Sequence, residues 1–199
     1  TRARGLTGSV SSQWDHLTNL TGNALMPNGG TAGNSAGHAD SREMTFDANG
    51  DLIEVNDAGI IRRTNPDDNT GDWFAINGNL EITEIHSVAY DTNFDIIMGG
   101  TQDTGTIEQS APGSTTWNSV GWADGGKVAV NDSVAGTSVR YFSIQRLGSF
   151  TRRTCNPGCA NVLAPLTGAN PAQFYTPLEI NANDPTRLLL GTGGGLSES

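Results

Sequence analysis

The chain has 199 residues, of which 35% are hydrophobic and 16% charged, with a formal net charge of −10. No run approaches the roughly 20 consecutive apolar residues that a membrane-spanning helix needs, so we expect no membrane insertion. Lysine and arginine total 11 against 21 acidic residues, which leaves no basic stripe for a phosphate backbone and excludes nucleic acid as an expected partner.

Turn-forming residues dominate the composition. Glycine contributes 26 of the 199 residues, roughly twice its usual share of about 7%. Asn, Thr, Asp and Ser, which favour turns, fill much of the remainder. The apolar runs are short, and no long segment keeps the spacing of an amphipathic helix. The sequence therefore predicts an all-β fold made of many short strands.

A pattern of short apolar strands and acidic or Asn-containing turns recurs along the chain. It begins at Met44, Val88, Val128 and Leu178, so the steps are 44, 40 and 50 residues. A four-strand unit repeated every ~40–50 residues is typical of β-propeller blades. Tryptophans mark the places where a fourth, outer strand would begin, at Trp14, Trp73 and Trp117.

In chain order, the predicted strands are 44–47, 52–55, 60–63 and 73–76 in the first complete blade, 87–91, 96–100, 106–110 and 116–120 in the second, and 127–131, 140–144, 150–154 and 161–164 in the third. We expect one β-propeller region over 1–199, divided into 1–20 (outer half of a blade), 38–80, 81–121 and 122–169 (blades), and 170–199 (inner half of a blade). Either the chain is a fragment of a larger propeller, with the remaining blades as its partners, or 178–199 and 1–20 pair to close a four-bladed ring. We favour the fragment.

The two cysteines are Cys155 and Cys159, and the residues between them are Asn-Pro-Gly. That tight turn can bring the sulfur atoms to bonding distance, so we expect a disulfide that closes a hairpin; the alternative is two reduced thiols on a loop. A disulfide favours an oxidising compartment, extracellular or periplasmic. No second Cys or His pair has the spacing of zinc ligands, and no nucleotide-binding fingerprint is present, so no metal site and no cofactor is expected.

Four motifs carry a family resemblance: His38-Ala-Asp-Ser-Arg-Glu-Met-Thr-Phe-Asp, Asn56-Asp-Ala-Gly-Ile-Ile-Arg-Arg, Gly99-Gly-Thr-Gln-Asp-Thr-Gly-Thr and Trp122-Ala-Asp-Gly-Gly. Together they resemble the BNR-type (sialidase or Asp-box-like) and sortilin-like β-propellers of secreted bacterial proteins. That superfamily also includes xyloglucan-cleaving glycoside hydrolases. The resemblance covers most of 38–199 and implies a secreted propeller. No Arg-Ile-Pro motif is present, so a sialidase arginine triad cannot be assigned.

Candidate site residues lie in the loops that join the second strand to the third and one blade to the next, because ligands generally bind on that face of a propeller. Glycosidic cleavage needs two carboxyl groups, one as acid and one as base or nucleophile. Asp103 and Asp124 are the pair that we would assign to catalysis, and Trp122 or Tyr175 could stack on a sugar ring. The expected ligand-binding residues are His38, Asp40, Asp57, Gln102, Trp122, Arg146 and Tyr175, with Gln145 beside them.

Structural roles compete with these assignments. Asn-Asp-x-Gly around Asp57 and Gln-Asp-x-Gly around Asp103 are turn sequences in their own right, and we favour that interpretation. His38 suits a loop-locking hydrogen bond better than acid–base catalysis. Asp47-Ala-Asn-Gly-Asp suits a hairpin turn better than a calcium loop. The arginine pairs 62–63 and 152–153 are expected to face solvent.

The leading hypothesis is a secreted, non-catalytic β-propeller module that presents a loop-lined face to a glycan or a protein. The alternative is part of a polysaccharide-acting glycoside hydrolase that uses paired Asp residues. A third possibility is a purely structural propeller segment, with the binding function in blades that are missing from this chain.

Overall fold

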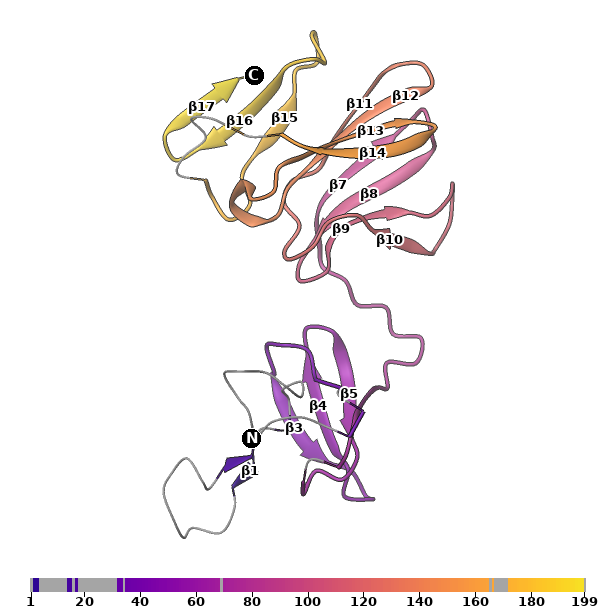
Figure 1. The fold of residues 1–199 in the computed structure, drawn as a ribbon, viewed down its shortest axis with the longest axis vertical. Coiled ribbons are helices and arrows are strands. Elements are labelled where there is room, and N and C mark those ends of the chain that lie inside the picture. Colours follow the sequence, from indigo (N-terminus) through magenta and orange to yellow (C-terminus); the bar gives the residue numbers. More distant parts are fainter. Residues whose placement is uncertain are drawn as a thin grey trace. The chain divides into compact units, whose positions relative to one another are not determined.

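The computed structural model describes residues 2–3, 14–15, 17, 32–33, 35–68, 70–164, 166 and 172–198 (Figure 1). Within these ranges the regular structure is β-strand, apart from the short 3-10 turn η2 (Gln145–Leu147). The predicted all-β fold is therefore confirmed. Among the described residues, no helix is long and apolar enough to cross a membrane.

The chain divides into two compact units, unit 1 (Thr1–Ile82) and unit 2 (Thr83–Ser199). In the described part of unit 1, β1 (Arg2–Ala3) pairs with β2 (Trp14–Asp15). A four-stranded antiparallel sheet follows in the order β3 (Glu43–Phe46), β4 (Leu52–Asn56), β5 (Gly59–Arg63) and β6 (Trp73–Ala75). Of the predicted half-blade 1–20, only β1, β2 and Leu17 are among the described residues, and the remainder lies outside them.

The described part of unit 2 contains three antiparallel sheets in which each strand pairs with the next along the chain. The first is β7 (Ile85–Asp91), β8 (Ile96–Thr101), β9 (Gly105–Gln109) and β10 (Trp117–Ser119). The second is β11 (Ala129–Val134), β12 (Thr137–Phe142), β13 (Thr151–Asn156) and β14 (Gly158–Leu163). The third is β15 (Leu178–Ile180), β16 (Leu188–Thr192) and β17 (Gly195–Glu198). Strand β11 contacts both β7 and β15, so the first strands of successive sheets are neighbours (Figure 1).

Most predicted strands lie within a few residues of the observed ones, and Trp73 and Trp117 begin the fourth strands of their sheets. The β11–β14 sheet differs most. A bulge between Asn131 and Val134 extends β11 beyond the predicted 127–131. The hairpin at the two cysteines continues the ladder back to Gly158, so β14 begins before the predicted 161–164.

In the sheets that begin with β3, β7, β11 and β15, an Asp or Asn in or just after the first strand forms a local side-chain turn, which for Asn131 lies at the bulge inside β11. The side-chain Oδ1 of this residue accepts a hydrogen bond from the backbone N–H two residues later, at Asp47, Asp91, Asn131 and Asn181. This is the Asx turn that short polar side chains favour. At Asp47 the same oxygen also accepts from the N–H of Asp51, which agrees with a hairpin turn at this sequence.

The middle sheet of unit 2 has an apolar core on each face. Phe142 packs with Met98 of β8 and with Val128, which lies just before β11. The neighbouring Tyr141 instead belongs to a cluster with Phe150 and the leucines of the β15–β17 sheet, Leu178, Leu188 and Leu190. Consecutive residues of a strand point to opposite faces. Tyr141 therefore packs toward the β15–β17 sheet, and Phe142 packs toward the β7–β10 sheet.

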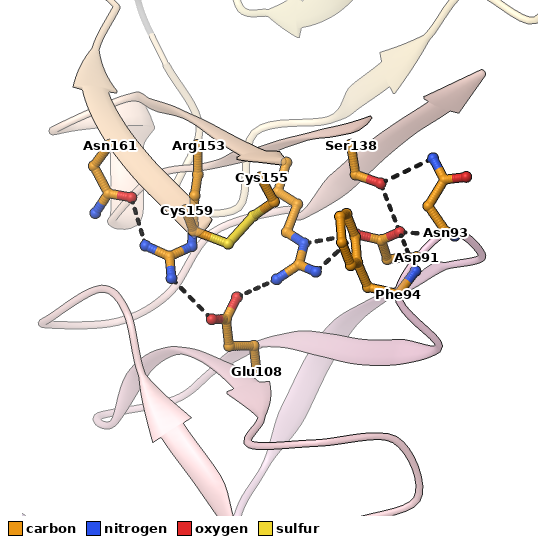
Figure 2. The surroundings of a disulfide bond; sticks show 10 residues. Asp91, Asn93, Phe94, Glu108, Ser138, Arg153, Cys155, Cys159 and Asn161 are labelled. Carbon is orange, nitrogen blue, oxygen red and sulfur yellow. Dashed lines mark hydrogen bonds and ion pairs between the residues drawn. A yellow bond between two sulfur atoms is a disulfide. The ribbon is translucent and has the colours of Figure 1, made fainter. Parts of the chain in front are cut away.

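Buried charges join the β7–β10 sheet to the β11–β14 sheet (Figure 2). The side chain of Arg140 is only 4% exposed and pairs with the carboxylates of Asp91 at 2.7 Å and Glu108 at 2.6 Å. Arg153 lies opposite Arg140 in the ladder and pairs with the other oxygen of Glu108 at 3.0 Å. Glu108 therefore offsets the repulsion between two arginines that face one another on adjacent strands.

The expectation that both arginine pairs face solvent is wrong for one member of each pair. Arg63 is fully buried and donates to the carbonyls of Leu17 and Asp68. Arg153 faces Glu108, while the adjacent Arg152 is exposed. The reason is strand alternation, because two consecutive residues cannot both face solvent when one sheet face is covered.

The predicted disulfide between Cys155 and Cys159 is present. The two residues are direct partners across β13 and β14, with their Cα atoms 4.0 Å apart. Cys155 is buried against the ion-pair network and Cys159 is exposed (Figure 2). The bond therefore closes the turn end of the hairpin.

Candidate functional site

Within unit 2, glycines bring the turn between β8 and β9 into backbone contact with the loop that follows β10. A Cβ atom at Gly100 would overlap the carbonyl oxygen of Gly126, and one at Gly125 would overlap that of Gly105. This close approach lets the N–H of Gly125 donate to the carbonyl of Thr101 at 2.9 Å. The Gly-Gly motifs at 99 and 125 therefore have a packing role, since only glycine fits so close to another backbone.

Gln102 links the side chains of Asp103, Asp124 and Tyr175, and these four residues form the polar cluster of the site. Its Nε2 donates to Oδ1 of Asp124 at 2.6 Å and to Oδ1 of Asp103 at 3.1 Å. The backbone N–H of Asp103 also donates to Oδ1 of Asp124, at 3.1 Å. The two predicted catalytic carboxylates thus lie in one cluster, and both are engaged by the same amide.

Tyr175 joins this cluster from the segment before β15. Its hydroxyl donates to Oε1 of Gln102 at 2.5 Å, and its ring lies 3.9 Å from the ring of His86, centroid to centroid. Nε2 of His86 donates to the carbonyl oxygen of Gly125. Burial raises the pKa of Tyr175, and the carboxylates of Asp124, Glu84 and Asp103 raise it further because they disfavour a second negative charge.

A further loop adds Gln145 and Arg146. The backbone N–H of Gln145 donates to the carbonyl of Asp124 at 2.8 Å, and that of Arg146 donates to the carbonyl of Phe174 at 2.9 Å. The guanidinium of Arg146 lies 6.0 Å from the centre of the Phe174 ring, at the outer limit of a cation–π contact. Arg146 supplies a positive charge to a loop cluster that is otherwise acidic.

The backbone of these loops adopts left-handed conformations at residues other than glycine. Asp103, Ala123 and Arg146 have φ values of 62°, 58° and 58°. Such conformations are uncommon for residues with a side chain and cost free energy. They are held here by the hydrogen bonds that join the loops to one another.

A groove of about 300 Å³ lies between the β7–β10 and β11–β14 sheets. Trp122 forms part of its rim and is 67% exposed, whereas Phe142 is buried at its base. The lining residues are Val120, Gly121, Trp122, Phe142, Ile144, Ser149, Thr151, Asn161 and Leu163. The groove and the polar cluster are adjacent in sequence, because Trp122 precedes Asp124 by two residues.

The structure thus groups Gln102, Asp103, Asp124 and Tyr175 directly, with Arg146 in a loop that is bonded to theirs. His86 and Phe174 also contact the cluster, through Tyr175 in both cases, and nothing in the sequence indicates either of them. His86 lies within an apolar strand pattern and Phe174 in an irregular segment, so neither carries a local signal. The groove residues of β13 and β14 were missed for the same reason.

The other predicted ligand-binding residues belong to unit 1. Nδ1 of His38 lies 3.2 Å from the carbonyl oxygen of Ala39, a local contact. The carboxylate of Asp57 pairs with the guanidinium of Arg42 at 2.8 Å. Asp40 is exposed and has a φ of 61°. His38 and Asp57 thus have partners within unit 1.

No family model matches this chain, and no curated protein matches it. One solved structure that is similar is the extracellular domain of a one-component system from B. thetaiotaomicron, at a TM-score of 0.40 and 11% sequence identity. The match covers 80% of this chain and 21% of the other, so the chain spans about a fifth of that structure.

Proposed function

We propose that this chain is part of a secreted β-propeller related to the BNR and sortilin-like proteins, and that unit 2 binds a glycan through the loops around Gln102. The observation that carries the proposal is the convergence of Gln102, Asp124 and Tyr175 from separate loops, with the exposed Trp122 two residues before Asp124 in the chain. Amide, carboxylate and phenol groups pair with sugar hydroxyls, and an exposed aromatic face suits the apolar side of a sugar ring.

Two further features support the proposal. The repeated antiparallel sheets of unit 2, with neighbouring first strands, are what successive propeller blades would require. The left-handed backbone at Asp103, Ala123 and Arg146 gathers in the same loops, and such conformations cluster at ligand sites. The disulfide fits an oxidising compartment.

The test is titration calorimetry of the protein against a panel of soluble oligosaccharides. Gln102→Ala removes the amide that orients both carboxylates and Tyr175, so we expect about tenfold weaker binding of any sugar that binds. Glu179→Gln, which removes an exposed carboxylate from β15, serves as the control and should leave binding unchanged. Equal affinities for the Gln102 variant and the parent protein would contradict the assignment of this site.

Hydrolysis is the second candidate, because Asp103 and Asp124 lie in one hydrogen-bonded cluster, as a mechanism with two carboxyl groups needs. The measurement is the appearance of new reducing ends on β-glucan and xyloglucan. If the chain cleaves either polymer, Asp103→Asn and Asp124→Asn should each abolish most of the activity. Cleavage that survives both changes would exclude these residues as the catalytic pair.

A further inference from the structure

The groove beside Trp122 has a chemical character that the polar cluster does not share. None of its nine lining residues carries a charge. Its base is the buried ring of Phe142, and Trp122 and Leu163 at its rim are 67% and 69% exposed. Ser149, Thr151 and Asn161 add neutral hydrogen-bonding groups to the apolar walls.

Asn161 is held in one orientation by the buried ion pairs. Its Oδ1 accepts a hydrogen bond from the guanidinium of Arg153 at 2.8 Å, and Arg153 is in turn fixed by Glu108 at 3.0 Å (Figure 2). Because the side-chain oxygen is engaged, the Nδ2 hydrogens are the polar groups that Asn161 offers to a ligand. Arg153 therefore acts as a positioning residue for Asn161.

We infer that this groove is a subsite for one uncharged sugar ring, which stacks on Trp122 while a hydroxyl accepts a hydrogen bond from Nδ2 of Asn161. The inference rests on the proposed glycan-binding function and extends it to a substrate class. An acidic sugar is disfavoured for two reasons. No lining side chain can neutralise its carboxylate, and Asp124 follows Trp122 by two residues in a protein with a net charge of −10.

The experiment compares the affinities of a neutral gluco-oligosaccharide and a uronic acid oligosaccharide of the same length. Trp122→Ala should weaken binding of the neutral ligand about tenfold or more, and Trp122→Phe should weaken it less because an aromatic face remains. Trp122 is largely exposed, so neither change should prevent folding.

Asn161→Asp separates ligand contact from folding. The new carboxylate still accepts from Arg153, so the thermal midpoint should not fall, but the N–H donors are lost and a negative charge enters the groove. We expect several-fold weaker binding of the neutral sugar. Thr154→Ala, a change in the same hairpin at a residue that does not line the groove, is the control.

The outcomes distinguish the two proposals. If the neutral sugar binds and Gln102→Ala weakens it, but Trp122→Ala and Asn161→Asp do not, the groove assignment is overturned and the proposed function stands. A preference for the uronic acid ligand would also overturn the inference. If no oligosaccharide binds, both proposals fail. An apolar peptide that binds in a Trp122-dependent way, where sugars do not, would assign the groove to a protein partner instead.

Discussion

Gln102 shows how one side chain can order several others. Its oxygen accepts from Tyr175 and its nitrogen donates to Asp103 and Asp124, so every polar end of the amide is used. An amide is suited to this position because it carries an acceptor and two donors on one rigid group. The same arrangement places the phenol of Tyr175 among carboxylates, which has a measurable consequence.

We expect Tyr175 to ionise above the ordinary tyrosine value of about 10. Burial is the largest cause of its raised pKa, and Asp124 adds to it, so Asp124→Asn should lower the pKa of Tyr175 part of the way toward normal. The folded state then holds this proton more tightly than the unfolded chain does. Its contribution to the free energy of unfolding is full below about pH 10 and is lost as the pH rises through the folded value.

The titration can be followed by NMR of ¹³C-labelled tyrosine, with the Tyr175 signal assigned by Tyr175→Phe. Asp95→Asn provides a control within the same chain, because Asp95 accepts from Tyr90 and raises the pKa of Tyr90 instead. That change should shift the signal of Tyr90 and leave Tyr175 as it was. An ordinary pKa for Tyr175 in the parent protein would contradict the proposed cluster.

At the scale of strands, the contact between the β7–β10 and β11–β14 sheets depends on buried charge as well as on apolar packing. Arg140 pairs with both Asp91 and Glu108, and all three side chains are largely buried. Removing one partner of such a network leaves charges that water cannot reach, which is more costly than losing an exposed pair.

Arg140→Met is therefore expected to lower the free energy of unfolding by about 3–5 kcal/mol, as urea denaturation would measure. Arg152→Met is the matched control, because Arg152 lies in the adjacent strand of the same sheet but is exposed, and its loss should cost less than about 0.5 kcal/mol. Similar losses in the free energy of unfolding for both variants would show that the buried ion pairs of Arg140 stabilise the protein no more than the exposed Arg152 does.

At the scale of the whole molecule, the division into two units predicts where the chain is cut first. No strand is present among the described residues 76–84, and Glu81 and Glu84 in this segment are both exposed. Proteases cut exposed, irregular segments faster than strands that are held in sheets. Glu54 and Glu108, by contrast, are buried within sheets.

Limited digestion with a glutamate-specific protease should therefore cut first after Glu81 or Glu84 and leave two resistant fragments, which mass spectrometry would identify. The double change Glu81→Gln and Glu84→Gln should slow this first cut and leave later cuts unchanged. A first cut after Glu43 or Glu179, which are exposed but lie in strands, would contradict the division into two units.

The strands and turns could be predicted from the sequence because their causes are local. The short apolar run at Leu52–Ile53, the Asx residues in or just after the first strands and the Cys155–Cys159 spacing all act within a few residues of one another. The same is true of the loop positions of Gln102, Asp103, Asp124 and Tyr175. Their identity as candidates followed from where the loops fall in the repeat.

Only the tertiary structure decided which side of each sheet is covered and what meets there. Strand alternation alone could not say that Arg153 faces Glu108 while Arg152 faces water, because that depends on a second sheet from another part of the chain. His86, Phe174 and the groove between the sheets were hidden for the same reason. Local pattern determines the elements, whereas the approach of distant segments determines burial, pairing and the shape of a site.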